Sequence, residues 1–137
     1  MKRIVLMSFV GLLGSLFLLS MTNAPQEKAK PWTIPANYQT MKNAVKADPA
    51  STAKAKENYA KFCKSCHGAA GLGDGTKSAS LKTTVPSFAT KEFQGQKDGV
   101  LFFQTTVGRD EMPSFEKKIP DANERWALVN YMRTFAK

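Results

Sequence analysis

Apolar residues recur at helical spacing along the chain, and no segment alternates between apolar and polar residues as a β-strand would. The first such segment spans residues 51–62, where Ser51 or Thr52 is expected to cap a helix. Its inward face has apolar residues at steps of four and three: Ala55, Tyr59 and Phe62. Its outward face is charged: Lys54, Lys56, Glu57 and Lys61. The pattern therefore predicts an amphipathic helix that ends near Phe62.

The last part of the chain gives the clearest helical pattern. Asp121 can cap this helix, and Glu124 follows three residues later as in a capping box. An apolar stripe at positions i, i+3, i+4 and i+7 then follows: Leu128, Tyr131, Met132 and Phe135. Packing in the core is the expected role of this stripe.

A shorter helix is expected between these two. Asp98 can cap it, the apolar residues at 100–103 would form its buried side, and Gly108 would end it. The fold class that follows is all-α, with three or four short helices and long loops over residues 51–137. Such a small set of helices has a thin apolar core, which indicates that another group fills the centre.

The N-terminal residues have the features of a targeting segment. Lys2 and Arg3 precede an uncharged apolar run at 4–21, and small residues follow at 22–24. Pro25 would directly follow a cut there, which is a poor context for cleavage. Residues 1–24 are therefore either a signal peptide or an uncleaved anchor, with membrane association through 4–21. Both alternatives place the protein in the periplasm or on the outer face of the inner membrane.

Residues 25–50 contain four prolines and no helical apolar stripe, so they predict an extended leader. Three large apolar side chains could attach this leader to the domain: Trp32, Ile34 and Tyr38. A loose tail is an equal alternative.

The chain has 137 residues and a net charge of +9, which falls to about +7 without residues 1–24. A basic exported protein is expected to meet acidic partners. The lysines are scattered singly and are not interleaved with aromatic residues, which argues against nucleic-acid binding.

The segment "CKSCH" at 63–67 holds both cysteines and the single histidine of the chain. Cys-x-x-Cys-His is the attachment pattern of a c-type haem, in which Cys63 and Cys66 bind the macrocycle and His67 ligates the iron. A disulfide would leave the histidine unexplained, and a thioredoxin-like pair would begin a helix within a βαβ unit. A structural zinc site needs four ligands, and this cluster supplies three.

The single histidine excludes a second histidine as the other axial ligand from this chain, so methionine becomes the candidate. Met41 belongs to the leader, and Met132 to the inward stripe of the last helix. Met112 lies in an irregular loop before Pro113, where it can approach the iron from the other face. We expect His67 and Met112 to be the axial ligands.

Together these residues resemble the class I cytochrome c family, in particular its small bacterial monohaem members, from Ala53 to the C-terminus. The residues that carry the resemblance beyond the haem motif are Ala55, Tyr59, Met112-Pro113, Leu128 and Tyr131. The resemblance implies a fold wrapped around one covalently bound haem c, with Leu128 against it. It also implies that the Pro86 carbonyl accepts the second N–H of the proximal imidazole and that Trp126 lies near a haem propionate or packs in the core. The family usually has glycine at the position of Ala55, which puts a close contact between Ala55 and Tyr131 in doubt.

The expected function is electron transfer between respiratory redox partners, because a haem with two protein ligands has no open site for a substrate. Two alternatives are an electron-entry subunit of a larger membrane oxidoreductase and a haem enzyme such as a peroxidase. Partners are expected to dock near the haem edge on exposed lysines: Lys64 first, then Lys77, Lys82, Lys117 and Lys118.

Overall fold

The computed structural model describes residues 25–137, and within this range it contains helices and no β-strand. The elements in chain order are α1 (Ala36–Thr40), α2 (Pro49–Phe62), α3 (Lys64–His67), the 3₁₀ helix η1 (Ser78–Ser80), α4 (Lys91–Gln94), α5 (Asp98–Val107) and α6 (Ala122–Arg133). The longer helices α2, α5 and α6 occur where the apolar pattern predicts them, which confirms the all-α class. The signal peptide or anchor expected at 1–24 lies outside the described residues. Between 25 and 137, none of the helices combines the length and apolarity that a membrane span requires.

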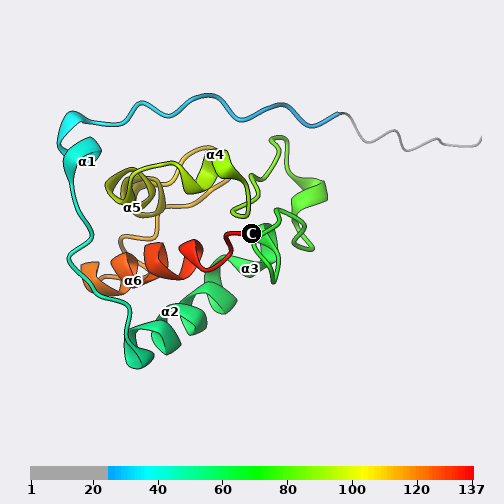
Figure 1. Ribbon diagram of the computed structural model, residues 1–137. Coiled ribbons are helices and arrows are strands. Elements are labelled where there is room, and N and C mark those ends of the chain that lie inside the picture. The colour runs from blue at the N-terminus through cyan, green and yellow to red at the C-terminus, as the bar shows by residue number, and fades with distance from the viewer. Residues whose placement is uncertain (1–24) are drawn as a thin grey trace, which may run out of the picture.

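The crossing of α2 and α6 organises the fold, and Figure 1 shows the two helices lying against each other with α5 on the far side of α6. Ala55 is completely buried in α2, and the ring centroids of Tyr59 and Tyr131 are 5.3 Å apart. The Asn58 amide donates a hydrogen bond to the Glu124 carboxylate at 2.8 Å, which ties the two helices together. The predicted inward face of α2 is therefore confirmed.

The helix caps differ from the sequence-based predictions in three places. The helix α2 begins at Pro49 instead of 51 or 52, because Asp48 is its N-cap and forms a capping box with Ser51. Proline is tolerated at the first helical position, where its missing N–H needs no partner. Asp98 is the first residue of α5, and its carboxylate pairs with Arg133 at 2.7 Å instead of capping the helix. Asp121 does cap α6, but Glu124 bonds to Asn58 and does not complete a capping box.

The leader is docked on the domain and contains the short helix α1, which its sequence pattern does not predict. Figure 1 shows residues 25–35 passing over the layer of α4 and α5 before the chain descends along one side to α2. The Tyr38 ring lies 4.9 Å from that of Phe103, and Asn43 donates hydrogen bonds to the Trp126 carbonyl and the Asn130 amide oxygen. A loose tail is therefore excluded for this segment.

The leader approaches α5 closely at Gly99. A Cβ atom at this position would lie 2.1 Å from the Tyr38 carbonyl oxygen and 2.8 Å from that of Met41. Both neighbours are backbone atoms, so they cannot move aside as a flexible side chain could. Glycine at 99 is thus required for the contact between α1 and α5.

We expect Gly99→Ala to lower the free energy of unfolding by about 1–3 kcal/mol, because the methyl group overpacks this contact. The loss would occur although alanine is the better helix former by about 1 kcal/mol. Chemical denaturation measures the effect, with Gly95→Ala as the control. A Cβ at Gly95 would come no closer than 3.1 Å to another atom, so that change should stay within about 1 kcal/mol. Equal effects of the two variants would show that the leader does not depend on the Gly99 contact.

Candidate functional site

The Cys-x-x-Cys-His segment continues directly from the end of α2. Cys63 is the C-cap of α2, and α3 then forms one helical turn that ends at His67. The backbone N–H groups of Cys66 and His67 both donate to the Cys63 carbonyl, at 3.1 and 2.9 Å. This single turn places both thiols and the imidazole on the same cavity.

The cavity has a volume of about 1060 Å³, part of which is open to solvent. Its apolar wall consists mainly of aromatic and aliphatic side chains: Phe62, Leu81, Val85, Phe88, Phe93, Leu101, Phe115 and Met132. The lining also includes polar residues from three segments of the chain: Thr83, Thr84, Gln104, Thr105, Arg109, Asp110 and Glu111. A large, flat and mostly apolar group with a polar edge fits this lining.

His67 is held as a neutral imidazole. Burial lowers its pKa to about 4, and the nearby Pro86 carbonyl opposes that shift only in part. Its ring stacks on Phe88 with a centroid distance of 4.4 Å, and its buried Nδ1 has no hydrogen-bond partner of good geometry. A neutral imidazole is the form that ligates a metal. The Pro86 carbonyl is thus close enough to affect the imidazole, but the predicted hydrogen bond to it from the imidazole N–H is not formed with good geometry.

The glycine-rich loop after α3 brings Pro86 to the histidine. The Gly73 N–H donates to the His67 carbonyl at 2.9 Å, and Gly73 has a φ of +80°. A Cβ atom there would lie 2.3 Å from the Val85 carbonyl oxygen, so only glycine lets the 85–86 segment come this close. The Tyr59 hydroxyl donates to the Gly68 carbonyl at 2.7 Å and fixes the start of the same loop to α2.

The two cysteines are unlinked thiols, and both line the cavity. Burial, with a smaller contribution from Cys66, raises the pKa of Cys63 to about 12, so this thiol is protonated at neutral pH. Within residues 25–137 no three side chains from His, Cys, Asp and Glu are grouped to bind a metal ion. The arrangement suits thioether bonds to a group in the cavity better than a zinc site.

Met112 reaches the cavity from a tight turn between α5 and α6. Arg109 and Met112 exchange two backbone hydrogen bonds of 2.8 Å, and Asp110 between them has a φ of 48°. The Glu111 carboxylate accepts hydrogen bonds from the backbone N–H groups of Lys82 and Thr83, which lower its pKa. The turn is thus tied to the loop on the other side of the cavity.

Five of the predicted haem-site residues line one cavity: Cys63, Cys66, His67, Pro86 and Met112. Trp126 and Leu128 do not line it. The Trp126 ring stacks on Phe102 at 3.9 Å, and Leu128 is 1% exposed within the helical core. Met132 belongs to the core as expected and also lines the cavity, whereas Met41 packs against the core elsewhere.

The sequence analysis missed most of the lining, including Ala29 and Trp32 of the leader and Arg109 of the turn before Met112. No local pattern marks them, because only the docked leader brings the first two to the cavity. Of the two alternatives for the leader, a loose tail and a segment pinned by its large apolar side chains, the structure shows the second, and Trp32 pins it at this site.

Comparisons with known proteins agree with this geometry. Residues 50–132 match the protein-family model described as cytochrome c oxidase, cbb3-type, subunit III. A search of curated proteins finds no match. Among solved structures, the chain is similar to a Kuenenia stuttgartiensis reducing HAO-like protein complex, Kustc0457/Kustc0458, with 25% identity and a TM-score of 0.61. That match covers 68% of this chain and 47% of the other, so it spans about half of the solved chain.

A second solved structure, the KustC0563 c-type cytochrome, is 31% identical with a TM-score of 0.52. The match covers 61% of this chain and 98% of that cytochrome. The cavity supplies what a covalently bound haem c needs, namely two adjacent thiols, a neutral imidazole and a large apolar space. The chain therefore belongs to the cytochrome c family that the matching model describes, with a class I cytochrome c fold and covalently bound haem c.

Proposed function

We propose that this c-type haem electron carrier uses His67 and Met112 as its axial ligands and exchanges single electrons with respiratory partners outside the cytoplasm. The observation that carries the proposal is the convergence of His67, Met112 and both cysteines on one cavity. The chain has no second histidine, so an iron bound to His67 must take another kind of residue, or water, on its other side.

The packing around Met132 favours Met112 as the second ligand. The Gln94 amide donates to the backbone carbonyls of both Phe88 and Met132, at 2.6 and 3.1 Å. Phe88 is the residue whose ring stacks on His67. Met132 therefore belongs to the wall that supports His67, whereas Met112 comes from a separate turn between α5 and α6.

The residues around the haem suit a carrier. Haem c supplies a one-electron Fe(III)/Fe(II) couple. Methionine is a soft, neutral ligand, and its thioether favours the reduced state and raises the reduction potential. Pro113 restricts Met112 to extended backbone geometry, which keeps the turn from coiling into a helix. With both axial positions taken by protein, a peroxidase-like reaction has no open site.

A second candidate function is that of an electron-entry subunit in a larger oxidoreductase. The matching family is described by an oxidase subunit, and the solved structure that shares 25% identity is a complex of a HAO-like protein. An uncleaved anchor at residues 4–21 would suit such a subunit, whereas cleavage near residue 24 would release a carrier into the periplasm. N-terminal sequencing of the protein from membrane and soluble fractions distinguishes the two.

Replacing Met112 tests the axial ligation. We expect Met112→Ala to keep its covalent haem, lose the sulfur–iron charge-transfer band of the oxidised protein, and bind carbon monoxide when reduced. The reduction potential should fall by on the order of 100 mV, part of the ~0.8 V range that axial ligands control. Absorption spectra and a redox titration of the purified protein measure these changes.

Met132→Ala is the matched control, because it removes the other methionine that lines the cavity. We expect it to lower the free energy of unfolding by about 2–5 kcal/mol, as emptied core positions do, and to retain the charge-transfer band. The reverse pattern in the two variants would assign the ligand to α6 and refute the role of Met112.

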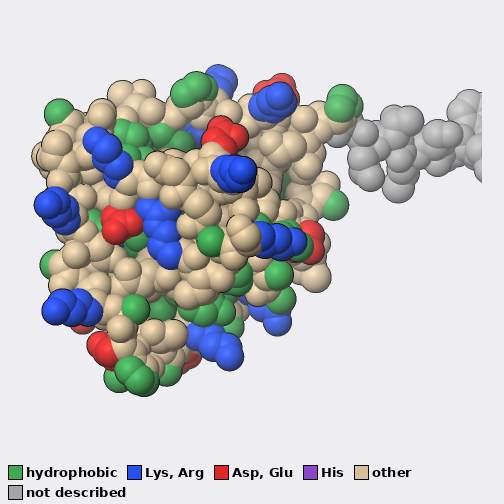
Figure 2. Space-filling model, viewed as in Figure 1, with side chains coloured by type: hydrophobic (Ala, Val, Ile, Leu, Met, Phe, Trp, Pro, Cys, Tyr) green, Lys and Arg blue, Asp and Glu red, His purple; other side chains and the backbone are tan. Residues whose placement is uncertain are grey.

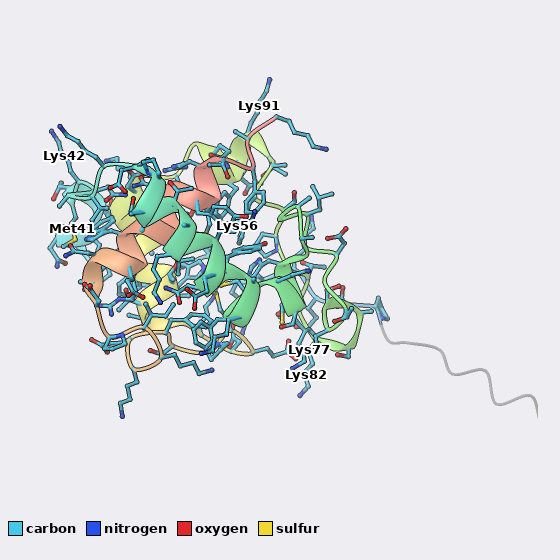
Figure 3. The ribbon with its side chains drawn as sticks, turned by 90° about the horizontal axis from the view of Figure 1, so that it is seen from below. Met41, Lys42, Lys56, Lys77, Lys82 and Lys91 are labelled. Carbon is cyan, nitrogen blue, oxygen red and sulfur yellow. The ribbon has the colours of Figure 1, made fainter. Side chains whose placement is uncertain are left out.

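The lysines suggest where partners dock. Lys64 lies between the two cysteines that line the cavity and is exposed, as are Lys77 and Lys82. Figure 3 shows Lys77 and Lys82 projecting together from one side of the molecule, whereas Lys42 and Lys91 project from the other. In Figure 2 the basic side chains are spread over the visible face without forming a stripe, which favours proteins over nucleic acid as partners. We propose that acidic faces of redox proteins dock around Lys64, Lys77 and Lys82, with Lys117 and Lys118 as further contacts.

Small charged oxidants test this docking surface. We expect ferricyanide, an anion, to oxidise the reduced protein several times more slowly at high salt than at low salt, because salt screens steering. Lys77→Glu should slow the low-salt reaction, whereas Lys91→Glu, the same charge change on the other side, should slow it less. Stopped-flow absorbance measures the rates. Equal effects of the two variants would mean that net charge, and not a local surface, sets the rate.

A further inference from the structure

The first described residues of the leader form a strap along one side of the cavity. We use "strap" for residues 26–32, which run in extended conformation along the upper edge of the molecule in Figure 1. Ala29 and Trp32 from this segment line the cavity itself. The strap therefore forms part of the haem site.

One end of the strap is bonded to the loop at 78–84. The Gln26 amide donates to the Ser78 and Leu81 carbonyls at 2.6 and 2.9 Å. Glu27 accepts from the Thr84 N–H and donates to the Lys82 carbonyl, both at 2.9 Å, as in a short parallel bridge. These bonds are mostly to backbone atoms, so they fix the path of the strap.

The other end of the strap holds the turn that carries Met112. The Arg109 guanidinium donates to the Pro31 carbonyl at 3.0 Å and to the Lys30 carbonyl. It also lies over the Trp32 ring, 4.1 Å from the ring centroid. Trp32 in turn meets Phe103 of α5 edge to face at 6.2 Å. The side chain of Arg109 is thus enclosed between carbonyls and an aromatic face.

These contacts complete a closed ring of three segments. The strap joins the 78–84 loop to Arg109, the Arg109–Met112 backbone pair closes the turn, and Glu111 returns from the turn to Lys82 and Thr83. Asp110 and Glu111 are exposed, and the turn has no helix or strand of its own to fix it. The stacking of Arg109 on Trp32 is therefore one of several contacts that hold this turn, beside the hydrogen bonds of Arg109 to the strap and those of Glu111 to the 82–83 segment.

We propose that Trp32 is a positioning residue, which acts through Arg109 to hold Met112 at the haem and so keeps the sixth position closed. This inference rests on the proposed ligation by Met112. A partly desolvated cation over an aromatic ring contributes enough free energy to change the ratio of displaced to docked turns by up to about tenfold. Loss of the ring should therefore increase the fraction of molecules in which the turn has moved away from the haem.

Two substitutions at the same position separate stacking from bulk. Trp32→Leu keeps an apolar side chain against Phe103 but has no ring for the guanidinium, whereas Trp32→Phe keeps a ring. We expect Trp32→Leu to weaken the sulfur–iron charge-transfer band, lower the reduction potential, and bind carbon monoxide up to about tenfold faster when reduced. Trp32→Phe should stay close to the wild type in all three measurements.

Asn43→Ala is the control for a general loosening of the leader. Asn43 bonds the leader to Trp126 and Asn130 on α6, and none of these residues lines the cavity. We expect this variant to lose stability in chemical denaturation without a change in the charge-transfer band or the rate of carbon monoxide binding.

The outcomes distinguish this inference from the proposal on which it rests. A wild-type protein without the charge-transfer band would overturn both the ligation by Met112 and the role of Trp32. A wild type with the band, together with a Trp32→Leu variant that behaves like Asn43→Ala, would overturn the role of Trp32 alone. If Trp32→Leu does not fold, a Trp32→Phe variant with the spectrum of Met112→Ala would likewise refute stacking as the cause.

Discussion

One helical turn at the end of α2 sets the position of everything else in the site. Because Cys63, Cys66 and His67 lie within five consecutive residues, the two thiols and the imidazole have almost no freedom relative to one another. The turn is fixed in its own right, since α2 is packed on α6 and the Tyr59 hydroxyl holds the following loop. The two cysteines are thereby held on a turn that is fixed by contacts on both sides.

Helices supply part of the remaining wall, and segments without regular structure supply the rest. The loops at 68–86 and 108–121 supply Pro86 and Met112, and they are held by glycine geometry, carboxylate-to-backbone bonds and the leader. Such segments have few contacts of their own, so they are the part of the fold most open to change. The structure thus combines a helical side that carries both cysteines and His67 with a loop side that carries Pro86 and Met112.

The sequence predicts what depends on local spacing and fails where distant segments meet. The three longer helices and the Cys-x-x-Cys-His segment follow from periodicity and a motif, and Met112 follows from elimination among three methionines. The predicted capping roles of Asp98 and Glu124 are wrong. Their partners, Arg133 and Asn58, are distant in the sequence, so no local pattern indicates them.

The same limit explains the residues assigned to the haem pocket. Leu128 and Trp126 share the apolar character of cavity residues, but the rotation of α6 turns them into the helical core and brings Met132 to the cavity. Trp32 lies among prolines in the leader, and its contact partner Arg109 is far away in the sequence. The local sequence pattern predicts neither the rotation of α6 nor the contact between Trp32 and Arg109.

The long sequence separation within the strap has a consequence for the order of assembly. Gln26 bonds to a residue 52 positions later, and the Arg109 contacts with Lys30 and Pro31 span 79 and 78 positions. Closing such long loops is entropically unfavourable until the segments they join are already in place. The strap is the earliest part of the described chain to be synthesised and among the last to find its partners. Until it docks, the cavity lacks the part of its lining that Ala29 and Trp32 supply.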